Sequence, residues 1–227
     1  MTTRFIMEKT ALITGANRGI GLALAQKLKS KGYNIIGVCR EKSSELDAIA
    51  SQIFEKVELT KSQDIKELAS KLKDTNIDLL VNNAGLLEDN VLGSIDVNSI
   101  RRMMEINAYA PLELTQALLP CLKKGSKVAL ITSRMGSIAD NTSGGRYGYR
   151  ASKAALNAFG KSLAVDLLPK GIALGILHPG YVQTRMVGFS GLISADESAS
   201  GLASIIDKLT LENSGSFWHS NGELLPW

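Results

Sequence analysis

The sequence lacks the features that mark a secreted, metal-binding or membrane-spanning protein. It has only two cysteines, Cys39 and Cys121. They fit neither a disulfide framework nor a metal-ligand pattern, so we expect two buried thiols, a reducing compartment and no metal site. No apolar run approaches the roughly 18 residues that a membrane-spanning helix requires. Residues 1–9 have no signal-peptide core, and the expected location is therefore cytoplasmic.

Long runs of one charge are also missing. The chain of 227 residues has 26 basic and 22 acidic side chains and a formal net charge of +4. No basic run exceeds the pairs Arg101–Arg102 and Lys123–Lys124, so nucleic-acid binding is not expected. With 44% hydrophobic and 21% charged residues, the composition is that of an ordinary globular protein. The slight basic excess favours an anionic small molecule as ligand.

What the sequence does contain is an alternation of short apolar runs with longer segments of helical periodicity. Several runs are apolar nearly throughout, as expected for strands buried on both faces of a parallel sheet. The predicted strands are Thr10–Thr14, Asn34–Cys39, Lys56–Leu59, Ile77–Val81, Lys127–Thr132 and Ile172–Leu177. The predicted helices are Gly19–Lys31, Ile65–Leu72, Val97–Leu122, Ala151–Leu168 and Asp196–Leu209.

This alternation predicts one doubly wound α/β domain over residues 1–227, of Rossmann type. We expect a mostly parallel, seven-stranded sheet flanked by helices. Two long irregular segments, residues 136–148 and 182–195, each follow a predicted strand. Both loops should therefore lie at the carboxyl edge of the sheet, where this architecture binds its ligands.

A glycine-rich turn joins the first predicted strand to the first predicted helix. Glycines lie at 15, 19 and 21 within the segment Thr14–Gly21. Gly15 permits a tight turn, and the other two allow a pyrophosphate and the sheet to approach the backbone closely. The free N–H groups at the start of the helix suit an anion. The position of this turn predicts dinucleotide binding.

The spacing of these glycines resembles the Thr-Gly-x-x-x-Gly-x-Gly pattern of the short-chain dehydrogenase/reductase family, and the resemblance continues along most of the chain. The further motifs that match this family, in order, are Asn82-Asn83-Ala84-Gly85, Asn107, Ser133, Tyr149-x-x-x-Lys153 and Pro179-Gly180 with Thr184. The resemblance implies an oxidoreductase that transfers hydride between a nicotinamide cofactor and a carbonyl or alcohol group. The cofactor-binding residues that it implies are Gly15, Asn17, Arg18, Gly19, Ile20, Gly21, Arg40, Leu59, Asn83, Ala84, Gly85, Tyr149, Lys153, Pro179, Gly180, Val182 and Thr184.

The residue after the second strand discriminates between the two nicotinamide cofactors. An acidic side chain there binds the ribose hydroxyl of NAD, whereas an arginine accommodates the 2′-phosphate of NADP. Arg40 occupies or adjoins this position, and the resemblance places Arg18 near the same phosphate. We therefore expect NADP. A shift of one residue would bring Glu41 to the ribose and favour NAD instead.

The catalytic residues implied by the resemblance are Asn107, Ser133, Tyr149 and Lys153. Lys153 lies four residues after Tyr149, so both share a helix face, and an ammonium nearby should lower the pKa of the tyrosine. Tyr149 would then donate a proton to the substrate oxygen, which Ser133 would also hydrogen-bond. Asn107 is expected to hold a water that passes protons to Lys153. Tyr147 lacks a lysine four residues later, because residue 151 is alanine.

The substrate is less defined by the sequence. The two long loops are mostly apolar, which favours a largely apolar aldehyde, ketone or quinone, although these side chains could equally serve packing or a subunit contact. Arg146 and Arg185 could bind an anion, but a solvated position is the favoured interpretation. Arg134 either narrows the site or points away from it. The apolar candidates are Met135, Ile138, Val182, Met186, Val187, Phe189, Leu192 and Ile193.

Within the family, the chain looks most like the branch of the C-factor signalling protein and the sniffer carbonyl reductases. The segment Tyr149–Asn157 and the tail from Gly215 to Trp227 carry this similarity. A carbonyl reductase is the first hypothesis. A cofactor-binding signalling protein and a 3-oxoacyl-thioester reductase are the alternatives. The resemblance also permits a homodimer or homotetramer.

Overall fold

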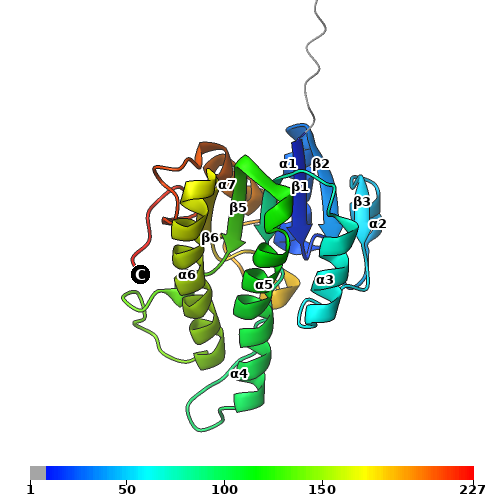
Figure 1. The fold of residues 1–227 in the computed structure, drawn as a ribbon. Coiled ribbons are helices and arrows are strands. Elements are labelled where there is room, and N and C mark those ends of the chain that lie inside the picture. Colours follow the sequence, from blue (N-terminus) through cyan, green and yellow to red (C-terminus); the bar gives the residue numbers. More distant parts are fainter. Residues whose placement is uncertain (1–8) are drawn as a thin grey trace, which may run out of the picture.

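The computed structural model describes residues 9–227, and these form a seven-stranded sheet with helices on both faces (Figure 1). The strand order is β3-β2-β1-β4-β5-β6-β7, and every neighbouring pair is parallel. This confirms the predicted doubly wound α/β fold. The strands are β1 (Lys9–Thr14), β2 (Tyr33–Val38), β3 (Gln52–Phe54), β4 (Ile77–Asn82), β5 (Leu122–Ile131), β6 (Ala173–His178) and β7 (Phe217–His219).

The α-helices lie between these strands in the sequence and cover both faces of the sheet: α1, α2 and α7 pack on one face, and α3, α5 and α6 on the other. Apolar side chains at helical spacing form them. Ser194 caps the last helix by accepting a hydrogen bond from the Glu197 N–H, and Gly32 follows the first helix with φ of 86°. The α-helices are α1 (Gly19–Ser30), α2 (Ser44–Asp47), α3 (Ser62–Lys71), α4 (Val97–Met104), α5 (Ala110–Ala117), α6 (Tyr147–Leu167) and α7 (Ala195–Lys208).

Two hydrophobic cores lie on opposite faces of the sheet. Neighbouring residues of each strand point to opposite faces, so Leu12 of β1 belongs to the core under α3, α5 and α6. Ile13, the next residue, belongs to the core under α1 and α7. All six residues of β6 are buried, as a central parallel strand requires. The sheet is therefore fixed from both sides, and its carboxyl edge is a rigid support for loops.

Several predicted boundaries are wrong. Lys56–Leu59 is not a strand: Lys56 has φ of 60°, and the strand lies earlier, at β3. The predicted helix Val97–Leu122 is four helical segments: α4, a π-helical segment at Glu105–Tyr109, α5 and a 3-10 helix at Leu119–Cys121. Leu122 already belongs to β5. The helix predicted to begin at Ala151 begins at Tyr147. The predicted elements include none at the positions of α2 and β7.

The cysteines, the length of the apolar helices and the possible metal ligands were also subjects of expectations from composition. Both cysteines are buried and unpaired, as predicted. No helix within residues 9–227 is long and apolar enough to cross a membrane. No group of three His, Cys, Asp or Glu side chains in that part of the chain is arranged to hold a metal ion. The prediction about a signal peptide falls mainly on residues 1–8, which lie outside the described residues.

Candidate active site

The glycine turn after β1 is held by the end of β4. The Thr14 hydroxyl accepts hydrogen bonds from the backbone N–H groups of Asn83 and Ala84, at 2.9 and 3.0 Å. The Asn83 side-chain amide donates to the carbonyl oxygens of Thr14 and Gly15, at 2.9 and 3.3 Å. The two segments that the sequence predicted to contact a cofactor are thereby joined into one rigid wall.

The shape of this wall requires glycine. A Cβ on Gly21 would lie 2.2 Å from the Gly15 carbonyl oxygen and 2.5 Å from Asn83 Nδ2, which is closer than atoms can approach. Gly15 and Gly19 have φ of 64° and 54°, in the left-handed region that favours glycine. A backbone this bare, at the start of α1, is the kind of cradle that a pyrophosphate occupies.

Two arginines lie at the sides of the turn. Arg18 precedes α1, and Arg40 follows β2 at the next strand of the sheet. Both are exposed, and neither guanidinium forms a hydrogen bond or an ion pair with another residue in the range 9–227. Glu41 is exposed as well, whereas Leu59 is buried in the core under α3. The arginines thus offer unpaired cations for a phosphate.

The segment after β6 extends toward the glycine turn. A Cβ on Gly19 would lie 3.5 Å from the Thr184 Cγ2, so the two loops almost touch. Gly180 has φ of 89°, and Val182 pairs with Ile193 in an isolated bridge. The Pro179 carbonyl accepts hydrogen bonds from buried serine hydroxyls. The segment after β6 therefore lies against the glycine turn at Thr184 and Gly19.

The four predicted catalytic residues come from three neighbouring elements. Ser133 follows β5, Tyr149 and Lys153 lie in the first turns of α6, and Asn107 lies in the π-helical segment. The Lys153 Nζ is 5.9 Å from the centre of the Tyr149 ring and donates to the Ile131 carbonyl at 2.9 Å. All four are buried.

Asn107 is fixed by its neighbours. Its Oδ1 accepts from the Leu86 N–H at 2.7 Å, and its Nδ2 donates to the Leu86 carbonyl at 2.8 Å and to the Ser152 hydroxyl at 3.0 Å. A Cβ on Gly85 would lie 3.2 Å from Asn107 Oδ1 and 3.9 Å from Lys153 Nζ. The motif after β4 therefore meets the catalytic residues at Gly85. A π-helical turn is rare and often marks a functional site, which gives a reason for asparagine in this helix.

Burial dominates the protonation of the pair. It lowers the pKa of Lys153 to about 8. It also raises the pKa of Tyr149 above its usual value, although the hydrogen bond with Ser133 and the charge of Arg146 act in the opposite direction. The expectation that Lys153 lowers the tyrosine pKa is therefore wrong in this structure, because desolvation outweighs the nearby charges.

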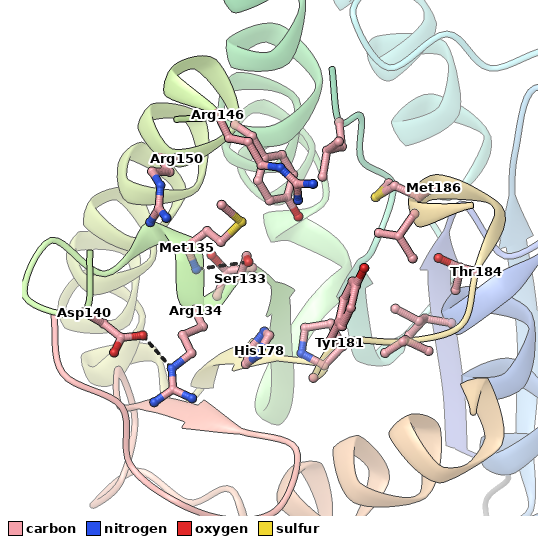
Figure 2. A pocket seen from close by; sticks show the side chains of 18 of the residues that line it. Ser133, Arg134, Met135, Asp140, Arg146, Arg150, His178, Tyr181, Thr184 and Met186 are labelled. Carbon is pink, nitrogen blue, oxygen red and sulfur yellow. Dashed lines mark hydrogen bonds and ion pairs between the residues drawn. The ribbon is translucent and has the colours of Figure 1, made fainter. Parts of the chain in front are cut away.

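A cavity of about 380 Å³ opens beside these residues. One side is formed by Ile20 and the segment after β6, the other by Ser133, Tyr149 and the loop before α6 (Figure 2). Of the apolar side chains predicted to line the site, Met135, Val182, Met186 and Val187 do so. Ile138, Phe189 and Leu192 are exposed instead, and Ile193 packs behind Gly180.

Sequence reasoning missed two polar residues of the cavity wall, Arg150 and His178. Arg134 and Arg146, which the sequence left as possible site residues, also line the cavity, and the Arg146 side chain is 40% exposed. His178, at the end of β6, has a buried Nδ1 without a hydrogen-bond partner among the described residues. The only available signal was its position, directly before the Pro179-Gly180 motif.

Comparison with known proteins agrees with this geometry. Residues 9–191 match the short chain dehydrogenase family. A 1-hydroxy-2-glutathionyl-2-methyl-3-butene dehydrogenase of Rhodococcus sp. (strain AD45) is 38% identical, over 96% of this chain and 99% of the relative. The C-signal protein of Myxococcus xanthus is 46% identical, over 66% of this chain and 93% of the relative.

A solved structure is similar over nearly the whole chain. The NADPH-bound carbonyl reductase from chicken fatty liver superimposes with a TM-score of 0.88 and 31% identity, covering 96% of this chain and 99% of that one. The match of the sequence motifs, the sheet order and the folded site thus points to one family. The chain belongs to the short-chain dehydrogenase family.

Proposed function

We propose that the protein is an NADPH-dependent carbonyl reductase. The observation that carries the proposal is that Ser133 and Tyr149 line one cavity that also borders the glycine turn at Ile20, with the Lys153 Nζ 5.9 Å from the centre of the Tyr149 ring. The Gly15–Gly21 backbone and the unpaired Arg18 and Arg40 fit a dinucleotide with a 2′-phosphate. When bound, the cofactor supplies the hydride for the carbonyl carbon.

The protein's own residues supply the proton and the orientation. Tyr149 retains its proton at neutral pH because burial disfavours the phenolate, so its hydroxyl can donate to the carbonyl oxygen. Ser133 hydrogen-bonds the same oxygen and stabilises the negative charge that develops there. Lys153 lies below the tyrosine ring and favours the phenolate once the proton has left.

Asn107 is assigned a positioning function. Its bonds to both backbone groups of Leu86 fix the loop after β4, and its bond to Ser152 fixes α6 next to Lys153. We propose that this connection keeps Lys153 at a constant distance from Gly85. The predicted proton-relay water beside Asn107 is retained as part of the proposal.

The experiment is oxidation of NADPH with a panel of aldehydes, ketones, quinones and oxoacyl thioesters, with Tyr149→Phe as the catalytic variant. Tyr147→Phe is the matched control, because Tyr147 lies two residues earlier and is partly exposed. We expect Tyr149→Phe to lower kcat by about 10²–10⁴-fold, the usual contribution of a general acid. Unchanged turnover in Tyr149→Phe would exclude this residue as the acid.

A second candidate is a signalling protein that binds the cofactor without physiological turnover. The similarity to the C-signal protein supports it. Tight NADPH binding with no turnover on the whole panel would favour this candidate. The buried, interconnected catalytic residues support the reductase, because cofactor binding alone does not require a tyrosine at the cavity.

A further inference from the structure

The wall of the active-site cavity has an excess of positive charge. It contains three arginines, Arg134, Arg146 and Arg150, and a single carboxylate, Asp140. Asp140 already forms an ion pair with Arg134, whose Nε lies 2.5 Å from the carboxylate. Two arginines therefore remain, and both belong to the beginning of α6 (Figure 2).

Arg150 has no acidic partner among residues 9–227. Its Nη2 donates to the Ser143 hydroxyl at 2.9 Å, and its Nε donates to the Gly144 carbonyl at 3.3 Å. These neutral acceptors hold the side chain in place without neutralising it. A guanidinium positioned in this way retains N–H donors for a ligand.

Arg146 lies one helical turn earlier. Its partner in an ion pair is Asp89, which competes only weakly with a ligand for the guanidinium. Arg146 pairs with Asp89 at 3.1 Å, but the Asp89 side chain is 68% exposed, so water screens this pair. The backbone of Arg146 has φ of 47°, a costly conformation for a residue other than glycine. Its charge also contributes to lowering the pKa of Tyr149, which places the guanidinium within electrostatic reach of the catalytic hydroxyl.

The start of α6 adds to this positive field. The helix has 21 residues, no acidic residue in its first turn and no side-chain cap. The Gly148 N–H donates to the neutral Asn90 Oδ1 at 3.3 Å, so no acidic side chain opposes the partial positive charge of this helix end next to both arginines. Nothing in this part of the cavity wall other than the paired Asp140 opposes that field.

We propose that the substrate carries a carboxylate that docks against Arg146 and Arg150 while its carbonyl group lies at Ser133 and Tyr149. This inference rests on the proposed reductase function and replaces the expected apolar substrate by an anionic one. The apolar side chains Met135, Met186 and Val187 would contact the carbon skeleton between the two polar ends. Arg146 and Arg150 thereby determine specificity and take no part in proton transfer.

The test compares two aldehydes that differ mainly in charge, 4-carboxybenzaldehyde and methyl 4-formylbenzoate, each with saturating NADPH. The wild-type protein should prefer the acid in kcat/KM by about 10-fold or more, as expected for a hydrogen-bonded charge pair. Arg150→Met should reduce this preference, and the double variant Arg146→Met/Arg150→Met should abolish it. Arg101→Met, the same change on the exposed face of α4, should leave it unaltered.

The neutral ester distinguishes loss of carboxylate binding from loss of proton transfer by Tyr149. Any disturbance of Tyr149 by the Arg146 substitution lowers turnover of both aldehydes, whereas loss of charge recognition lowers only that of the acid. The inference is overturned when the wild-type protein reduces the ester as well as the acid. It is equally overturned when the double variant keeps the wild-type ratio.

A binding measurement distinguishes failure of this inference from failure of the proposed function. 4-(Hydroxymethyl)benzoate is titrated calorimetrically into the NADP⁺-loaded wild-type protein and double variant. Binding to the wild type alone supports the arginine site even when no aldehyde is reduced, and then only the reductase proposal falls. Equal binding to both proteins, or binding to neither, removes the arginine site whatever the turnover.

Discussion

At the scale of single residues, the most unusual group is the ammonium of Lys153. It is buried, hydrogen-bonds a backbone carbonyl and has no carboxylate partner among residues 9–227. Burial of this kind costs stability whenever the group is charged. The chain keeps it, which is the pattern of an active site that gives up stability for chemistry.

This cost predicts a specific pH dependence. The pKa of Lys153 is lowered to about 8 in the folded protein, against 10.5 for the free side chain. Between these values the unfolded chain binds the extra proton, so folding becomes more favourable as pH rises. Relative to Lys153→Met, the wild type should gain about 2 kcal/mol of unfolding free energy between pH 7 and pH 9.5.

Urea unfolding of both proteins at the two pH values measures this difference. Lys66→Met, which removes an exposed lysine on α3, is the matched control and should track the wild type. A constant gap between wild type and Lys153→Met at both pH values would show that the lysine is not desolvated.

Arg40 is the residue that should select the cofactor. Replacing it by aspartate removes an unpaired cation and adds an anion where the 2′-phosphate is proposed to bind. We expect Arg40→Asp to weaken NADPH by about 10–100-fold while NADH changes little, because charged hydrogen bonds contribute about 1.5–3 kcal/mol. Fluorescence titration with both cofactors measures this, with Arg101→Asp as the control for net charge. Equal weakening of NADPH and NADH would show that Arg40 does not meet the phosphate.

Single residues also show where sequence reasoning works. Ser133, Tyr149 and Lys153 could be predicted because their spacing follows a family pattern. Arg150 could not, because nothing local to it indicates whether its helix face meets solvent or a cavity. The pKa of Tyr149 was predicted in the wrong direction for a related reason: a charge four residues away is visible in sequence, whereas burial is not.

At the scale of elements, the glycine turn and the end of β4 act as one unit. The Asn83 side chain closes the turn, and Gly21 leaves room for it. A methyl group at residue 21 would overlap the Gly15 carbonyl and displace Asn83 together with the backbone that it holds.

Gly21→Ala should therefore abolish cofactor binding. The clash lies at 2.2 Å from a backbone atom, which no side-chain rotation relieves. Gly32→Ala is the control: its Cβ meets nothing within 4 Å, and its φ of 86° costs about 1 kcal/mol of stability without touching the turn. Calorimetric titration with NADPH and thermal unfolding separate the two effects. Retained NADPH affinity in Gly21→Ala would mean that the turn does not form the binding wall.

Secondary structure could be predicted where a helix or strand is long enough to repeat its pattern of apolar residues several times. β1, β2, β4 and β6 have that length, but β3 and β7 are three residues each and offer too little periodicity. The segment Val97–Leu122 has a continuous apolar stripe, which hid the π-helical segment inside it. Within that segment Asn107 makes tertiary hydrogen bonds to the Leu86 backbone, and periodicity does not record such contacts.

At the scale of the whole molecule, His178 joins the cavity wall to the edge strand β7, which pairs with β6. Its ring lies 4.8 Å from that of His219 on β7, edge to face. Burial, His219, Arg134 and Lys153 together lower the pKa of His178 to about 3. The folded protein therefore holds this ring neutral where the unfolded chain would protonate it.

Acid should consequently weaken the fold. Below the unfolded pKa of about 6.5 the unfolded chain takes up a proton that the folded protein refuses, so stability falls with falling pH. Between pH 7 and pH 5 the wild type should lose about 2 kcal/mol more than His178→Gln. Chemical denaturation at both pH values measures this difference, and parallel losses in the two proteins would contradict it.

The helices that hold Asn107 and Tyr149 expose single apolar side chains among polar ones. Tyr109 and Val165 are 43% and 60% exposed there. A homodimer or homotetramer stays a prediction.

The separation of the two cores from the cavity loops makes the molecule suited to laboratory evolution. Residues within 134–146 and 181–192 line the cavity, and none of them belongs to the buried clusters on the two faces of the sheet. A library randomised at cavity-lining positions such as Met135, Met186 and Val187 would leave those clusters untouched. Selection for new carbonyl compounds could thus proceed with few library members lost to misfolding.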